Sequence, residues 1–302
     1  MTPLGDLLHV LQTHSAAALA VAALLGLLVG SFLNVVILRL PRMLERQWRI
    51  HCEELQQALR GEAASSTAAG ERFNLVTPAS HCPHCGHRLR ARENIPVLSY
   101  LLLRGRCSAC GAAISLRYPL VELATALLSM VVIWHFGPTA AGAAALLLTW
   151  ALIALSVIDY DHQLLPDDIT LPLLWLGLIF NSFGLFTDLQ SAVIGAVAGY
   201  LSLWSIYQLF KWLTGKEGMG YGDFKLLAML GAWLGWQYLL PIVLLSSIVG
   251  AVTGIALILL RGRDRNVPIP FGPYLAVAGW IVLLWGERIS QAYLTWMGLA
   301  PA

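Results

Sequence analysis

Charged residues are scarce in this chain, and their scarcity excludes an ordinary soluble fold. Asp, Glu, Lys and Arg make up only 12% of the 302 residues, whereas 58% are hydrophobic. A soluble domain has about one quarter charged residues and about one half apolar residues. The composition therefore predicts an all-α polytopic membrane protein surrounded by the lipid bilayer. The formal net charge of only +2 points to no nucleic-acid partner, and we expect none.

The sequence also lacks the motifs of several enzyme classes. It has no H-E-x-x-H motif of a metalloprotease and no G-x-S-x-G nucleophile elbow. No G-x-G-x-x-G follows a predicted strand, so a Rossmann nucleotide-binding fold is not indicated. The first sixteen residues contain neither Lys nor Arg, which argues against a cleavable signal peptide and favours a retained first membrane helix.

Apolar stretches long enough to cross a bilayer recur along the whole chain. About twenty apolar residues span the hydrocarbon core as a helix. We expect about eight transmembrane helices, with seven or nine as alternatives. The predicted segments are residues 16–38, 118–136, 139–158, 169–185, 189–210, 224–239, 240–260 and 268–286.

Lysine and arginine are unevenly distributed among the connections between these segments. They follow the first, fifth and seventh segments, but none lies in the connections after the second, fourth and sixth. The positive-inside rule then places residues 39–117 and the loops 159–168, 211–225 and 261–267 in the cytoplasm. The 159–168 loop has no basic residue of its own, so its side follows from the alternation alone.

Four of the five cysteines form two C-x-x-C pairs in the one soluble-looking insertion, between the first and second segments. The pairs are Cys82 with Cys85 and Cys107 with Cys110, a spacing typical of a zinc site with four thiolate ligands. Four thiolates fill a tetrahedral shell, so we expect a structural Zn²⁺ and not a catalytic one. A redox dithiol is the alternative interpretation. The remaining cysteine, Cys52, has no predicted role.

The chain accordingly divides into three predicted parts. Residues 1–41 hold the first transmembrane helix and its flanks. Residues 42–117 form a cytoplasmic zinc-binding insertion, whose small apolar content leaves much of its folding free energy to the metal. Residues 118–302 form a transmembrane domain that contains the remaining segments.

Aspartates gather at membrane level in two places. Asp159 directly follows the apolar run of the third segment, and Asp223 follows Gly220 and Gly222 at the start of the sixth. The alternation of loops places both on the cytoplasmic side at the same depth. Two adjacent carboxyl groups share one proton, so one can activate water while the other donates to a scissile carbonyl. The pair therefore indicates aspartic-protease chemistry, with helix capping or ion coupling as alternatives.

Stretches through nearly the whole chain resemble the bacterial type IV prepilin peptidases, a family of bifunctional leader peptidases and N-methyltransferases. The matching stretches are GSFLNVVILRLP (30–41), CPHC, CSAC, ISLRYPLVE (114–122), IDYDHQLLPD (158–167), GMGYGDFKLLAMLGAWLG (218–235) and FGPYLA (271–276). The resemblance implies a GxGD aspartic endopeptidase of the bacterial inner membrane whose active site faces the cytoplasm. Its catalytic residues are then Asp159 and Asp223, with Asp161 as the competitor of Asp159, and Gly220 and Gly222 shape the substrate site.

The resemblance also implies the substrates and a second activity. The enzyme would cleave the short basic leader from type IV prepilins and type II secretion pseudopilins after a glycine. It would then methylate the new N-terminal residue with S-adenosylmethionine. Composition and spacing indicate no binding pocket for that cofactor, so no residue is assigned to it. Asn34, a polar residue inside the first segment, either bonds a neighbouring helix or touches the cofactor.

Several alternatives stay open at this point. The chain can be a peptidase without methyl transfer, or another intramembrane GxGD protease of the presenilin or signal-peptide-peptidase type. That second class carries a downstream Pro-Ala-Leu motif, which is missing here, and lacks the four-cysteine insertion. A proton-coupled transporter with a zinc ribbon is a third reading, in which the aspartates would carry protons.

Overall fold

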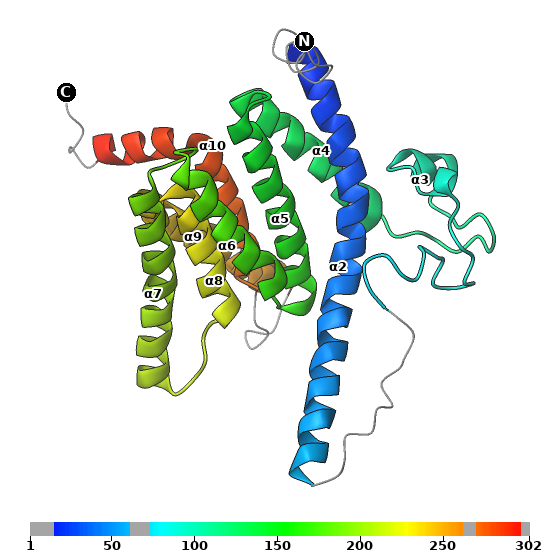
Figure 1. Cartoon of the computed structure of the whole chain (residues 1–302), viewed down its shortest axis with the longest axis horizontal. Coiled ribbons are helices and arrows are strands. Elements are labelled where there is room, and N and C mark those ends of the chain that lie inside the picture. The colour runs from blue at the N-terminus through cyan, green and yellow to red at the C-terminus, as the bar shows by residue number, and fades with distance from the viewer. Residues whose placement is uncertain (1–14, 61–72, 262–269, 297–302) are drawn as a thin grey trace. The chain divides into compact units, whose positions relative to one another are not determined.

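The computed structural model describes residues 15–60, 73–261 and 270–296, and these ranges contain helices and no named strand. The long helices are labelled in Figure 1. They are α2 (Ser15–Leu59), α4 (Arg117–Phe136), α5 (Ala140–His162), α6 (Asp167–Ser182), α7 (Leu189–Thr214), α8 (Tyr221–Leu234), α9 (Leu239–Arg261) and α10 (Gly272–Trp296). Short elements are α3 (Leu98–Leu102) and the 3-10 turns η1 (Ala91–Glu93) and η2 (Trp236–Tyr238). The all-α prediction is confirmed.

Each of the eight predicted segments overlaps one of these long helices. Within the described ranges, five segments are long and apolar enough to cross a membrane. They are Ser15–Leu59, Arg117–Phe136, Ala140–His162, Leu189–Thr214 and Trp236–Ala256. The chain is therefore a multi-pass membrane protein, and the number of eight crossings stays a prediction.

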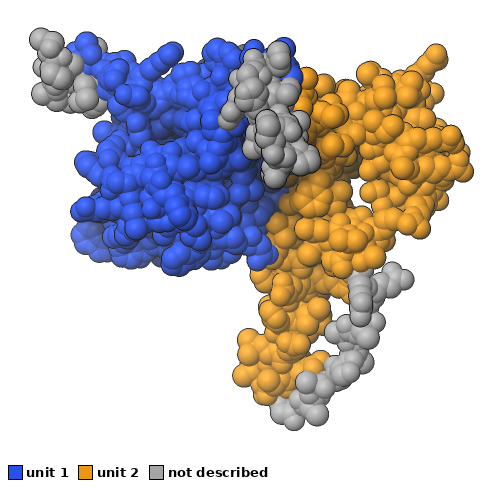
Figure 2. Space-filling model, turned by 45° about the horizontal axis from the view of Figure 1, so that its top comes forward, with its two compact units in different colours: residues 1–19, 131–302 blue, residues 20–130 orange. Residues whose placement is uncertain are grey.

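The chain forms two compact units. Unit 1 comprises residues 1–19 and 131–302, and unit 2 comprises residues 20–130 (Figure 2). The predicted boundary at residue 41 falls inside α2, which continues across Pro41 to Leu59. Residues 42–59 are rich in Glu, Arg, Leu and Gln, which favour helix, so the helix extends beyond the apolar run. The division into three functional parts stays a prediction.

In unit 2, α2 and α4 approach closely through two glycines of α2. A Cβ atom at Gly26 would lie 2.6 Å from the Cα of Ala126, and one at Gly30 would lie 2.7 Å from the Cα of Glu122. Small residues four positions apart allow this approach between membrane helices. One turn further along, the Asn34 side chain donates to the Tyr118 carbonyl at 3.1 Å. Asn34 thus bonds a neighbouring helix, which was one of its two predicted roles.

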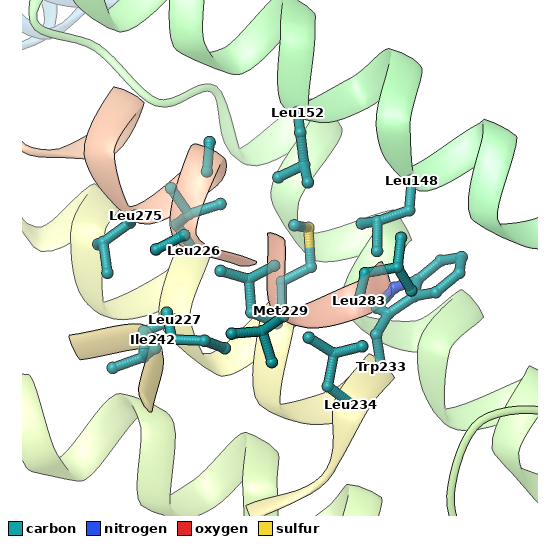
Figure 3. Close-up of a cluster of buried hydrophobic side chains, with 14 of the residues drawn as sticks. Leu148, Leu152, Leu226, Leu227, Met229, Trp233, Leu234, Ile242, Leu275 and Leu283 are labelled. Atoms are coloured by element: carbon teal, nitrogen blue, oxygen red, sulfur yellow. The ribbon is translucent and has the colours of Figure 1, made fainter. Parts of the chain in front are cut away.

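In unit 1, α8 forms the core. All residues from Leu226 to Leu234 are buried, and so is Phe224. Figure 3 shows side chains of α8, among them Met229 and Trp233, in one cluster with Leu148 and Leu152 of α5. A helix of 14 residues is about 21 Å long, which is shorter than the hydrocarbon core of about 30 Å. The predicted sixth segment is therefore centred on a buried core helix.

Close backbone contacts fix the position of α8. Gly195 of α7 and Gly231 of α8 face each other so closely that a Cβ atom on either would meet the carbonyl of the other. Asn181, at the end of α6, donates to the carbonyls of Ala232 and Trp233 at 2.8 and 2.9 Å. These contacts hold α8 against α6 and α7, and with it the residue at the start of α8.

Candidate active site and metal centre

Asp159 lies in the last turn of α5 and is buried, with 5% of its surface exposed. The helix ends at His162, and Gln163 adopts the left-handed conformation, with its N–H donating to the Asp159 carbonyl at 2.9 Å. This turn directs the chain back toward α6. Burial of a carboxyl group costs free energy unless the group is hydrogen-bonded or paired. The groups around Asp159 therefore have to account for its burial.

The carboxylate of Asp159 is held by the first residue of α10. Its Oδ2 atom accepts the backbone N–H of Gly272 at 3.0 Å. A Cβ atom at position 272 would lie 2.6 Å from the same oxygen, so a larger residue there would displace the carboxylate. A carboxylate at the N-terminus of a helix also interacts favourably with the helix dipole. Gly272 is a site residue that the sequence did not reveal, although the stretch FGPYLA contains it.

Asp223 lies in the first turn of α8 and is also buried, with 7% of its surface exposed. Its backbone N–H contacts the Gly220 carbonyl at 3.3 Å. Among the described residues, no group forms a hydrogen bond with its Oδ1 atom. A buried polar atom without a protein partner is uncommon and calls for a functional explanation.

The structure brings the two predicted aspartates together. Asp159 and Asp223 are close enough for a direct electrostatic interaction. Leu165 lies beside the segment that precedes Asp223 and beside the segment that binds the Asp159 carboxylate. Its side chain would be 2.8 Å from a Cβ atom at Gly222 and 3.2 Å from one at Gly272. The start of α8, the end of α5 and the start of α10 therefore converge around this leucine.

The two glycines before Asp223 have different surroundings. Gly222 faces Leu165, so the absence of a side chain permits a close contact within the protein. At Gly220, the nearest atom to an added Cβ would be Oδ2 of Asp223, at 3.8 Å. Gly220 therefore leaves open space beside the Asp223 carboxyl group, and its role in a substrate site stays a prediction.

The other aspartates of the 159–168 region are exposed. Asp161 lies at the end of α5 with its surface open, in contrast to Asp159. Asp167 and Asp168 occupy the first turn of α6, directly after Pro166. Asp167 accepts the Lys225 ammonium group at 2.7 Å in an exposed ion pair. Asp159 therefore differs from the neighbouring aspartates in being buried.

The four cysteines of the two C-x-x-C pairs form a second cluster, in unit 2. The sulfur atoms of Cys82, Cys85, Cys107 and Cys110 all lie within 4.8 Å of one another. Tetrahedral Zn–S bonds of about 2.3 Å place sulfurs about 3.8 Å apart, and the Cys82–Cys110 separation is 3.8 Å. The residues present therefore fit a metal ion of this kind.

Both knuckles have the same backbone geometry. Gly86 and Gly111 have a φ of +71°, and their N–H groups donate to the carbonyls of Cys82 and Cys107 at 2.9 and 3.0 Å. The N–H groups of Cys85 and His84 lower the pKa of the Cys82 thiol to about 7. The N–H groups of Cys110 and Ala109 lower the pKa of Cys107 in the same way. Each turn thus favours the metal-binding thiolate form of its first cysteine, Cys82 or Cys107.

Glu93 links the two knuckles. Its carboxylate accepts the Arg90 N–H at 2.8 Å and the Ser108 hydroxyl at 2.7 Å, and it lies 3.3 Å from Nε2 of His87. These contacts lower the pKa of Glu93 to about 2, the Arg90 N–H having the largest effect. Glu93 is therefore charged at neutral pH. It connects the loop after the first cysteine pair to Ser108, which follows Cys107.

We expect Glu93→Ala to release the bound metal about tenfold faster than the parent protein, because outer contacts orient the ligands of a metal site. The measurement is transfer of the metal to a chromophoric chelator at neutral pH. Glu54→Ala, at an exposed position of α2, is the matched control and should release metal at the parent rate. Equal rates for all three proteins would show that Glu93 does not support the knuckles.

Comparisons with known proteins cover both units. The family model described as the bacterial Peptidase A24 N-terminal domain matches residues 24–136. The model of the type IV leader peptidase family matches residues 146–255, which include both buried aspartates. No solved structure gives a significant match to the chain.

Three relatives match the chain almost from end to end. A prepilin leader peptidase/N-methyltransferase of Pseudomonas aeruginosa is 61% identical over 292 residues, covering 97% of this chain and 99% of the relative. A protein of the same name from Stutzerimonas stutzeri is 58% identical, covering 97% of this chain and 98% of the relative. Another from Xanthomonas campestris is 49% identical, covering 96% and 99%. The similarity therefore extends over the insertion and the membrane helices alike.

Proposed function

The chain belongs to the type IV leader peptidase family, and from that membership we propose its activity. It is a membrane aspartic endopeptidase that removes the short basic leader from type IV prepilins and type II secretion pseudopilins, cutting after a glycine. It then methylates the new N-terminal residue with S-adenosylmethionine. The observation that carries the proteolytic part is the buried pair of Asp159 and Asp223.

The unequal surroundings of the two acids support different roles for them. Asp159 accepts an N–H from Gly272, which favours a negative charge on its carboxylate. Asp223 has an oxygen without a partner among the described residues, and a shared proton can reside on this group. Asp159 then takes a proton from the attacking water, while Asp223 donates one to the scissile carbonyl oxygen.

The open space at Gly220 supports a path for the substrate backbone. An extended peptide can pass next to the Asp223 carboxyl group where no side chain intervenes. Gly222 contributes differently, because it allows Leu165 to pack against the start of α8. Both glycines thus shape the substrate site, one by leaving room and one by positioning the acid.

Sequence topology supports the location of the site. The positive-inside rule places the loop after α5 and the loop before α8 in the cytoplasm. Asp159 and Asp223 lie at the ends of helices next to these two loops. The enzyme is accordingly a multi-pass protein of the bacterial inner membrane with its acids at the cytoplasmic surface, where the basic leader of a precursor would lie.

The cysteine cluster supports a structural role for a metal ion. A Zn²⁺ ion would be held by Cys82, Cys85, Cys107 and Cys110. When bound, it would cross-link the two knuckles. Four thiolates leave no open coordination position, so the proteolytic chemistry belongs to the carboxyl groups. No residue is assigned to S-adenosylmethionine.

A mass measurement tests both activities in one experiment. Purified protein is incubated with a prepilin precursor, with and without S-adenosylmethionine, and the product mass is followed. We expect loss of the leader in both reactions and a further gain of one methyl group only when the cofactor is present. Leader loss without the methyl gain would leave a peptidase only. An unchanged precursor would reject the proposed function and favour the transporter reading.

A further inference from the structure

A stripe of apolar side chains lies on the surface of the insertion, along α3 and the turn before it. Leu98, Leu101 and Leu102 of α3 occupy positions i, i+3 and i+4, which share one side of a helix, and Ile95 precedes them. All four side chains are exposed, and residues 94–103 contain no charged residue. These four residues are called the α3 stripe below. An exposed apolar patch of this kind marks an interaction surface.

Arginines lie on both sides of the α3 stripe. Arg90 and Arg92 precede it, Arg104 and Arg106 follow it, and all four residues are exposed. Apolar side chains next to cationic ones are typical of a segment that lies in the membrane interface. The apolar groups enter the acyl region there, and the cations meet anionic lipid headgroups. The stripe and its flanks therefore have the chemistry that fits a lipid surface.

A buried carboxylate attaches α3 to the membrane helix α4. The backbone N–H of Val97, the residue before α3, donates to Oε2 of Glu122 at 2.8 Å, and Glu122 is buried. Glu122 lies about 7.5 Å along the helix axis from Arg117, where α4 begins. Because α4 is long and apolar enough to cross a membrane, this bond fixes the start of α3 beside a membrane segment.

The backbone at Val97 is strained. Its φ is +57°, a region that β-branched residues rarely adopt. Such a conformation costs free energy and persists only where the surroundings hold it in place. The bond to Glu122 is the contact that holds it. A strained turn that is kept by a buried carboxylate indicates that the position of α3 matters to the protein.

The attachment point also agrees with the depth of a membrane interface. Helices that lie in the interface bury their apolar face by about 5–10 Å, and Glu122 is within this range of the start of α4. The positive-inside rule places that start on the cytoplasmic side. Leu120 and Leu127 of α4 are exposed, so lipid covers α4 from its first turns onward. The same lipid is therefore within reach of α3.

We propose that the α3 stripe is an interfacial membrane anchor of the insertion. Ile95, Leu98, Leu101 and Leu102 lie in the acyl region of the cytoplasmic leaflet, and the flanking arginines bind anionic headgroups. The insertion is then cytoplasmic only in part. Since Cys107 follows Leu102 closely in the chain, the anchor keeps the cysteine cluster at the membrane surface.

The test places a photoreactive residue at matched positions of the full-length protein in bilayers of phosphatidylcholine and phosphatidylglycerol. Leu101→p-benzoylphenylalanine probes the stripe, where Leu101 is 65% exposed. Leu127→p-benzoylphenylalanine, at a 60% exposed position of α4, is the lipid-facing reference. Leu55→p-benzoylphenylalanine is the control outside the bilayer, because Leu55 is 62% exposed and lies on α2 about 21 Å along the axis beyond Pro41. After irradiation, mass spectrometry measures the fraction of each protein that carries a phospholipid adduct.

We expect the Leu101 variant to form at least about ten times more phospholipid adduct than the Leu55 variant, because its side chain lies among acyl chains. Its yield should approach that of the Leu127 variant. The three positions have similar exposure, so a difference in yield reports the surroundings and not access to the probe. The measurement needs no catalytic activity, and its outcome is independent of the proposed function.

An adduct yield at Leu101 as low as at Leu55 would overturn the anchor and place α3 in water. Cross-links from Leu101 to a second copy of the chain, without lipid adducts, would also overturn it and make the stripe a protein contact. If the Leu101 variant is not produced, Leu102→p-benzoylphenylalanine probes the same stripe and is judged by the same comparison.

Discussion

Asp159→Ala and Asp223→Ala are each expected to lower the rate of leader cleavage by between about 10²-fold and 10⁴-fold, the contribution typical of a positioned general acid or base. Both carboxyl groups are buried, and they interact with each other. Removing either one leaves no partner to share the proton, so neither half of the reaction can proceed. The measurement is the initial rate of leader loss, followed by mass, with purified enzyme and a prepilin precursor.

Asp161→Ala is the matched control for this prediction. Asp161 lies on the same helix two residues after Asp159 but is exposed, so its replacement should leave cleavage within about threefold of the parent rate. Asp159→Asn and Asp223→Asn should be as inactive as the alanine variants, because they keep the size of the side chain and remove the titratable oxygen. Normal cleavage by Asp159→Ala, with loss in Asp161→Ala, would move the catalytic role to Asp161.

The second large effect concerns the cysteine cluster. Purified protein should contain about one zinc ion per chain, and Cys82→Ser or Cys107→Ser should lose it and unfold the insertion. Structural zinc sites contribute apparent free energies of about 10–16 kcal/mol in small domains at neutral pH. Within residues 73–116, the described segments contain only the short elements α3 and η1, so little else can hold the fold. Metal analysis and protease sensitivity of the insertion measure the outcome.

Cys52→Ser is the control for the thiol substitutions. Cys52 is exposed on α2 and is not among the clustered cysteines, so this variant should keep both the metal and protease resistance. A metal content near zero in the parent protein, with the four thiols intact, would contradict the zinc assignment. Leader cleavage that survives in Cys82→Ser would show that the metal serves the insertion and not the proteolytic step.

Much of the architecture could be predicted from the sequence because the bilayer imposes simple rules. Apolar runs located the helices, and the two C-x-x-C pairs located the metal site, whose sulfurs the structure gathers within 4.8 Å of one another. Asp159 directly follows an apolar run in the sequence, and it is buried in the structure, with 5% of its surface exposed. These features depend on residues that are close in the sequence, so they can be predicted from it.

Features that depend on distant contacts could not be predicted. Gly272 lies 113 residues from Asp159, and only the folded chain shows its N–H bound to that carboxylate. The burial of α8 on all sides was not predicted either, because composition does not distinguish a lipid-facing helix from one buried among other helices. The extension of α2 past Pro41 was also missed, since charged helix formers resemble a soluble loop in composition alone.

The contact between Gly195 and Gly231 has a consequence for the precision of the acid pair. Backbone meets backbone at that point, so α7 and α8 have no intervening side chain that could adjust their spacing. Asp223 lies eight positions before Gly231 on the same helix, about 12 Å along its axis. The alignment of the two carboxyl groups therefore depends on a contact inside the helix bundle. A single methyl group added at that contact would tilt or shift α8, the helix that carries Asp223.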